Sequence, residues 1–165
     1  MSQRTPSGAP PPDTARISGI RVALAPLAES ICARYLLEFP DDVDRYGDGA
    51  MAWCCHDNQW LLAWAADDVL GATDLNEQAS WLARVLHARG FPAERLTRNL
   101  TLAAELAEQG AFGEASAAVA DRLRGSAGGS CRTRLVDELA HQRLRQGAAA
   151  APPGGDRHGD RPSSG

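Results

Sequence analysis

The segment Trp53-Cys54-Cys55-His56-Asp57 gathers the side chains of this sequence that are best suited to chemistry. Thiol, imidazole and carboxylate groups can bind a metal, carry a covalently attached pigment, or pack as ordinary side chains of a helix. Successive residues of an α-helix point about 100° apart, so these polar groups diverge instead of converging on one ion. We therefore predict no zinc site here.

Helical spacing decides which of these residues are neighbours. Residues three or four positions apart share a face, which places Cys54 beside Asp57, Leu61 and Trp64, and places Trp53 beside Asp57 and Trp60. The cysteine could be a small core residue. A carboxylate among so many apolar side chains needs solvent, a cation or several N–H donors, because an unpaired buried charge is costly. We therefore expect a ligand or another polar group to face Asp57.

The sequence contains no recognisable catalytic arrangement. It has no Ser/His/Asp or Cys/His set, glycine-rich phosphate loop, HExxH or CxxC motif. His56 and His87 could act as acid, base or ligand near neutral pH, although a lone helical histidine is more often a surface residue or has its hydrogen bonds satisfied. We therefore predict that the protein is not an enzyme.

Composition excludes several classes of partner. The 165 residues suffice for one domain, and 17 basic against 21 acidic residues give a net charge of -4, so no positive field attracts nucleic acid. No apolar run reaches the roughly 18 residues that span a bilayer, and the first residues lack the apolar segment of a signal peptide. We expect a cytoplasmic protein without a membrane or nucleic-acid partner, and with its four cysteines as thiols.

The spacing of apolar residues predicts an all-α fold. Apolar residues recur at three and four positions, and nothing alternates over the length of a strand. Pro26 and Pro92 suit helix starts, Pro40 suits a helix end, and Asp74 with Glu77 resembles a capping box. The expected helices cover about residues 25–39, 50–70, 74–90, 92–109 and 114–124, with a polar connector over 41–49.

Both ends of the chain differ from this central part. Residues 1–20 and the C-terminal tail are rich in Pro, Gly, Ala and Ser, and cannot bury enough apolar surface to offset the entropy of ordering. We expect a disordered segment over 1–20, a helical domain over 21–124, and a linker, a short amphipathic helix and a disordered tail over 125–165. Leu135 and Leu139 of that last helix could dock on the domain or on a partner.

The order of these features resembles that of the phycobiliproteins, the phycocyanin and allophycocyanin group, whose domain has a globin-like helical fold. In that family a helix ending in Phe-Pro or Gln-Pro leads to a helix bearing Cys-x-x-Asp, and here Phe39-Pro40 precedes Cys54 and Asp57. The stretches LLAWAADDVLG, WLARVLHARGFPAERLTRNL and GEASAAVADRL are similar to the segments that follow in the family. The resemblance covers roughly residues 21–124.

This resemblance implies a bilin, a linear tetrapyrrole, as cofactor. Cys54 would bond covalently to the bilin, and Asp57 would accept hydrogen bonds from its pyrrole N–H groups. His56, Trp60, Leu61 and Trp64 belong to the same implied site. His56 replaces the family's basic residue that holds a propionate, and the helices through which antenna subunits pair are missing. The resemblance therefore favours a bilin-binding sensor or regulatory module over a light-harvesting subunit.

Two other hypotheses stay open for the same architecture. His87 precedes the corner Gly90-Phe91-Pro92, and HARGFPAERL is similar to the corner region of globin sensors, which would make His87 the proximal ligand of a haem. Alternatively, the domain binds no pigment and forms a homo-oligomer or binds a regulatory protein through its helical surface.

Overall fold

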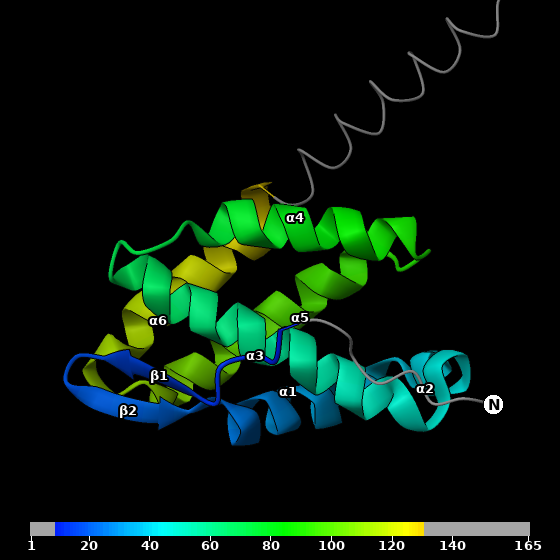
Figure 1. The fold of residues 1–165 in the computed structure, drawn as a ribbon, viewed down its shortest axis with the longest axis horizontal. Helices are drawn as coiled ribbons and strands as arrows, with labels where there is room; N and C mark the ends of the chain where they lie inside the picture. The colour runs from blue at the N-terminus through cyan, green and yellow to red at the C-terminus, as the bar shows by residue number, and fades with distance from the viewer. Residues whose placement is uncertain (1–8, 131–165) are drawn as a thin grey trace, which may run out of the picture.

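The computed structural model describes residues 9–130 of the chain, as helices with one small sheet (Figure 1). The predominantly helical prediction is confirmed, and the amphipathic segment around Leu135 lies outside the described residues. The strands are β1 (Thr14–Ile17) and β2 (Ile20–Ala23); the α-helices are α1 (Leu24–Glu38), α2 (Pro40–Tyr46), α3 (Ala50–Val69), α4 (Leu75–Ala88), α5 (Ala93–Leu106) and α6 (Ser116–Gly125). Shorter turns of helix cover Gly47–Gly49, Ala107–Ala111, Gly113–Ala115 and Ser126–Ser130.

The N-terminal β-hairpin corrects the prediction that the fold contains only helices, and it corrects the predicted disorder of residues 1–20 for the part from Thr14 on. β1 pairs antiparallel with β2, with Ile17 opposite Ile20. Ser18 and Gly19 have φ angles of 48° and 77°, so the loop is a two-residue turn that matches the twist of the strands. Ala15, Ile17 and Val22 are buried, and this apolar face gives the hairpin its reason to order.

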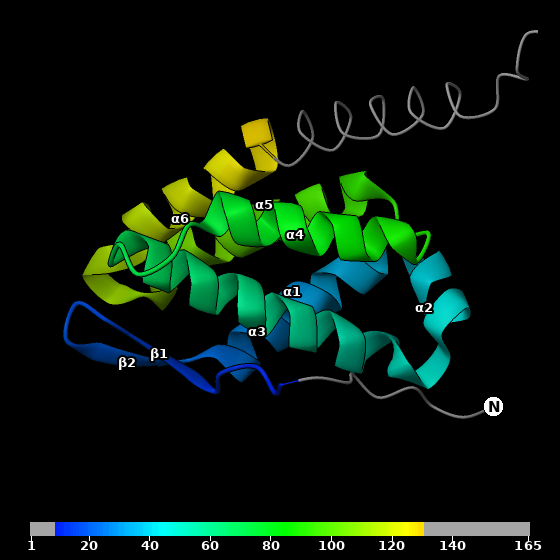
Figure 2. The same ribbon diagram turned by 45° about the horizontal axis from the view of Figure 1, so that its top comes forward.

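Helix α3 runs between the hairpin and α4 in both views (Figures 1 and 2). It packs against α1, and α1 in turn packs against α5. Large apolar side chains from all these elements fill one continuous core, because each helix carries an apolar stripe. The largest fully buried ones are Phe112, Leu24, Ile31, Leu61, Leu62, Leu75, Leu100, Leu102 and Leu123.

Helix α2 occupies the stretch predicted as a polar connector, and that prediction is wrong. Pro40 starts the helix, Asp41 and Asp42 lie in its first turn and Arg45 in its last, an arrangement that the helix dipole stabilises. Arg95 of α5 forms ion pairs with Asp41 and Asp42, at 2.6 Å each. These ion pairs fix α2 against α5.

Helix α4 begins where the capping pattern predicts. The Asp74 side chain accepts hydrogen bonds from the backbone N–H groups of Asn76 and Glu77, at 2.8 and 3.2 Å. Gly90 follows the helix with a φ of 75°, a conformation that favours glycine, and Pro92 precedes α5. Helices α1, α3, α5 and α6 likewise lie within a few residues of the predicted ranges, although the last turn predicted for α5 is a separate π-helical turn.

Candidate ligand cavities along helix α3

A cavity of about 1080 Å³ opens beside the N-terminal half of α3. Its walls come from α1, α2, α3, the end of α4 and α5, with the α3 residues spaced so that they share one face. Of the predicted site residues, Cys54, Asp57 and Leu61 line it. The other lining side chains include Tyr35, Asp42, Arg45, Tyr46, Trp53, Asn58, Leu86, Arg89, Phe91 and Asn99.

A second cavity of about 510 Å³ lies between α3 and α4. The predicted residues His56, Trp60 and Trp64 line this smaller cavity. Asp57 also lines it, as do Trp53, Leu86 and Arg89, so these four residues form a ridge shared by both cavities. The structure therefore divides the predicted site between two adjoining cavities, with Asp57 at their junction.

His87 is the one predicted site residue that the structure leaves apart. It lies in the last turn of α4, its side chain is exposed, and it lines neither cavity. A proximal haem ligand has to face an enclosed apolar pocket, and His87 faces solvent instead. The structure gives no support to the haem hypothesis.

Asp57 is a partly buried carboxylate with one close partner. Its Oδ1 atom lies 3.0 Å from Nδ1 of His56, and its side chain is 25% exposed. Burial raises the pKa of Asp57 above its ordinary value, while the hydrogen bond to His56 and the charge of Arg89 partly oppose that rise. The expectation that a polar group faces Asp57 is thus met in part by its own neighbour, and Asp57 lines both cavities.

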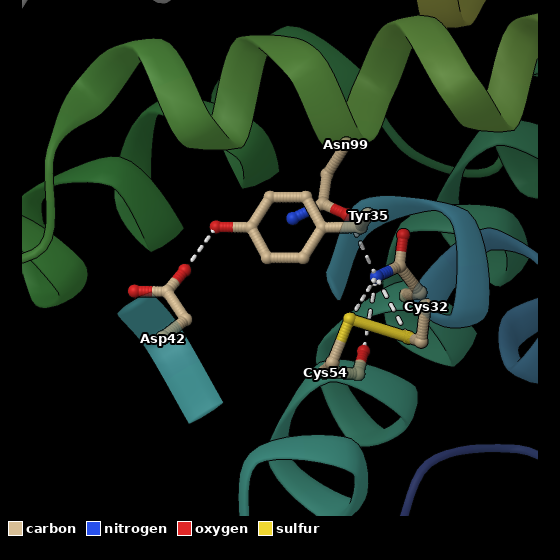
Figure 3. Close-up of a disulfide and its surroundings, with 6 residues drawn as sticks. Cys32, Tyr35, Asp42, Cys54 and Asn99 are labelled. Atoms are coloured by element: carbon tan, nitrogen blue, oxygen red, sulfur yellow. Dashed lines mark hydrogen bonds between the residues drawn. A yellow bond between two sulfur atoms is a disulfide. The ribbon is translucent and has the colours of Figure 1, made fainter. Parts of the chain in front are cut away.

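Cys54 forms a disulfide with Cys32 of α1 (Figure 3). The prediction that the cysteines are thiols is therefore wrong for this pair. Packing of α1 against α3 brings the two Cα atoms to 5.8 Å, inside the range that a disulfide bridges, and no sequence spacing reveals such a pairing. Cys55 is a half-buried free thiol whose pKa is raised by burial, and it lines neither cavity.

Asn58 is a buried amide that sequence reasoning missed. It is 1% exposed, and its Nδ2 donates to the carbonyl of Cys54 at 3.0 Å and to Oδ1 of Asn99 at 3.2 Å. Within the described part of the chain, its Oδ1 has no hydrogen-bond partner. A buried unpaired acceptor is costly, so this amide is unusual for a residue with a purely structural role. Its position four residues after Cys54, on an apolar face, was a signal available in the sequence.

Two arginines supply positive charge to the larger cavity. Arg45 donates to the carbonyl of Gly90 at 3.0 Å, and the Arg89 guanidinium lies 5.6 Å from the ring centre of Trp53. Residues 47–55 contain no basic side chain, yet folding brings these two cations from α2 and from the end of α4. The cavity lining therefore combines a carboxylate and an amide on α3, an apolar wall and cations that suit carboxylates.

In the same cavity wall, the hydroxyl of Tyr35 donates a hydrogen bond to Oδ2 of Asp42, a residue that is 2% exposed (Figure 3). Burial, together with the neighbouring Asp42 carboxylate, raises the pKa of Tyr35, so the hydroxyl remains a donor. Arg95 forms an ion pair with the other oxygen at 2.6 Å, so a protein group contacts each oxygen of the Asp42 carboxylate. Asp42 therefore stabilises the cavity wall, and Asp57 and Asn58 are the better candidates for contacts with a ligand.

Over residues 9–130, no cluster of three or more His, Cys, Asp or Glu side chains could hold a metal ion. None of the described helices is both long and apolar enough to cross a bilayer. The chain matches no protein-family model, and no curated protein or solved structure is significantly similar to it.

Proposed function

We propose that the protein is a non-enzymatic helical module that binds a linear tetrapyrrole in its larger cavity and acts as a sensor or regulatory domain. The proposal includes the globin-like relationship to the phycocyanin group and a signal passed to a partner or a second copy through the helical surface. One observation carries it: Asp57 and Asn58 line the same cavity of about 1080 Å³, and among the described residues the buried Oδ1 of Asn58 has no hydrogen-bond partner.

The chemistry of a bilin fits these residues. A linear tetrapyrrole brings several pyrrole N–H donors, an apolar conjugated chain that absorbs visible light, and carboxylate side chains. Asp57 and Asn58 would accept hydrogen bonds from the pyrrole N–H groups. Trp53 and Phe91 would pack on the conjugated chain of the bilin, and Arg89 would pair with one of its carboxylates. At about 1080 Å³, the cavity is slightly larger than the roughly 300–1,000 Å³ that is usual for cofactor sites.

The Cys32–Cys54 disulfide determines whether a bilin can bind covalently to Cys54. With its sulfur bonded to Cys32, Cys54 has no thiol for a covalent link, so the bilin binds non-covalently in this state. A covalent bond to Cys54 would require prior reduction of the disulfide by an external thiol. Asp57 is then the residue on which recognition depends in both redox states.

Titration of the purified protein with biliverdin tests the proposal. We expect a saturable shift of the visible absorption band, with binding weakened about 10- to 100-fold in Asp57→Asn, because a hydrogen bond to a charged group contributes about 1.5–3 kcal/mol. Asp67→Asn is the matched control, since Asp67 is exposed on the same helix and lines neither cavity. It should bind as the unmodified chain does.

Two outcomes would count against the proposal. Equal affinity in Asp57→Asn and Asp67→Asn would show that biliverdin binds elsewhere. Absence of a saturable shift, with and without a thiol reductant, would leave a pigment-free interaction module. Haemin added in parallel should give no His87-dependent band.

A further inference from the structure

The smaller cavity is lined by four tryptophans. Three of them, Trp60 and Trp64 of α3 and Trp81 of α4, have rings in contact, and we call the surface that they form the tryptophan groove. The rings of Trp60 and Trp64 are stacked with centroids 5.5 Å apart, and Trp81 meets Trp64 edge-on at 6.5 Å. Trp81 is 50% exposed, which is unusual for the largest apolar side chain. The groove is thus a preformed aromatic surface open to another segment.

We propose that the tryptophan groove docks an extended proline-rich segment, and that its occupant is the chain's own stretch Ala9-Pro10-Pro11-Pro12. Ala9 lines the smaller cavity together with the three tryptophans. Pro11 and Pro12 are half-buried, although they belong to no helix or strand. In both ribbon views the start of the described chain passes beside α3 before it enters β1 (Figures 1 and 2).

The composition of this stretch gives it the shape that aromatic grooves bind. Each proline fixes its own φ near −65° and keeps the preceding residue extended, so Ala9 and the three prolines favour the polyproline II helix. That helix has three residues per turn, which places Ala9 and Pro12 on one face. Because the segment is ordered before it docks, binding costs little conformational entropy.

The chain also holds the segment close to its groove. The backbone N–H of Leu24 donates to the carbonyl of Asp13 at 2.9 Å, which ties the end of the segment to the start of α1. A tether this short gives a high effective concentration, so even a weak contact with the tryptophans keeps the groove occupied. A proline-rich peptide added from outside has to compete with this internal occupant.

The test uses the full chain and a variant carrying Pro10→Ser, Pro11→Ser and Pro12→Ser. Indole N–H signals in nuclear magnetic resonance spectra, assigned with single Trp→Phe variants, report the groove. We expect the signals of Trp60, Trp64 and Trp81 to move in the triple variant, and Trp81 to become more accessible to acrylamide quenching. Pro26→Ser is the control, because Pro26 is exposed on α1 and lines neither cavity.

A synthetic peptide, SGAPPPDT, supplies the second arm. Added to the triple variant, it should return the three indole signals toward their original positions, whereas the unmodified chain should require at least about fivefold more peptide. The peptide SGASSSDT should move none of them. Trp81→Ala should lose the response to SGAPPPDT while keeping the helical circular dichroism of the parent.

Three results would overturn the inference. Unchanged indole signals in the triple variant would place the segment away from the groove. A lack of response to SGAPPPDT in the triple variant would mean that the tryptophans do not recognise proline. Signals that depend on protein concentration in the unmodified chain would assign the occupant to a second copy. None of these readouts involves a tetrapyrrole, so the test is independent of the proposed function.

Discussion

At the scale of single residues, the site is defined by polar groups that an apolar helix would otherwise exclude. Asp57 keeps its place on α3 because His56 contacts it and because a quarter of its side chain remains exposed. Asn58 is nearly fully buried, and its amide nitrogen donates hydrogen bonds, while its oxygen has no partner among residues 9–130. Such a combination is expensive in a purely structural helix and is consistent with a ligand site.

The Cys32–Cys54 disulfide is the residue-level feature with the largest expected effect on stability. It closes a loop between positions separated by 22 residues, and restriction of the unfolded chain should raise the free energy of unfolding by about 3 kcal/mol. We expect the unmodified protein to unfold at lower urea concentration when a thiol reductant is present. Cys54→Ala should show no such difference between oxidising and reducing conditions.

Cys55→Ala supplies the control for this prediction. Cys55 is adjacent to Cys54, but it is free, so this variant should retain the full response to reductant. Peptide mapping by mass spectrometry should find Cys32 joined to Cys54. Alkylation of both cysteines in the folded, unreduced protein would contradict the assignment.

At the scale of elements, the sequence predicts the long helices, whose apolar residues recur periodically. It does not predict α2 and the hairpin, which depend on tertiary contacts. The long helices carry apolar residues at three and four positions over 14 or more residues, and capping groups such as Asp74 mark their ends. α2 has a mostly polar sequence, and contacts with Tyr35 and Arg95 hold Asp42 in place. The strands of the hairpin have four residues each, too few for their alternation to stand out.

The same limit applies to the candidate site. Helical spacing correctly places Asp57 and Leu61 beside Cys54, and all three line one cavity. Spacing also groups Trp64 with them, yet Trp64 faces the smaller cavity, because side chains on a helix spread around its axis. The bond from Cys54 to Cys32 and the position of Arg45 at the cavity depend on how the helices pack together. Residue spacing within a single helix does not predict that packing.

The hairpin allows a matched test at this scale, because Ile17 and Ile20 are paired across its turn but differ in burial. Ile17 is 2% exposed and Ile20 is 42% exposed. We expect Ile17→Ala to lower the free energy of unfolding by about 2–4 kcal/mol, since it leaves a cavity in the core. Ile20→Ala should cost about 1 kcal/mol or less.

Urea unfolding followed by circular dichroism measures both hairpin variants. A similar, small loss in the two proteins would mean that the hairpin does not pack on the helices and that the N-terminal segment contributes little to the core. A large loss for Ile17→Ala alone would establish that the domain begins before residue 20.

At the scale of the whole molecule, two kinds of carboxylate change the folding stability with pH in opposite directions. One kind forms ion pairs between helices, and the other is Asp57 at the cavities. Arg98 donates to both oxygens of Glu38 at 2.7 Å and lowers its pKa, and Arg34 and Arg98 lower the pKa of Glu105. These contacts join α1 to α5. Burial acts the other way on Asp57 and raises its pKa.

The direction of each pKa shift determines whether folding stability rises or falls with pH. Glu38 stabilises the fold above its ordinary pKa of 4.5, and this contribution is lost as pH falls through its lowered folded value. For Asp57, both folded and unfolded states are protonated below the ordinary value of 3.8. As pH rises from there through the raised folded pKa, the unfolded state ionises first, so stability falls and then levels off.

The variant Asp57→Asn isolates the second contribution. Its free energy of unfolding, minus that of the unmodified protein, should increase as pH rises above about 4 and become constant above the folded pKa of Asp57. Glu38→Gln should behave oppositely: it is less stable than the unmodified protein at neutral pH, and the difference disappears in acid. Urea titrations at several pH values between about 3 and 8 measure both curves. A flat or falling difference for Asp57→Asn would mean that this carboxylate is not held at the cost of stability, and the strongest physical reason to regard it as a ligand-binding group would be lost.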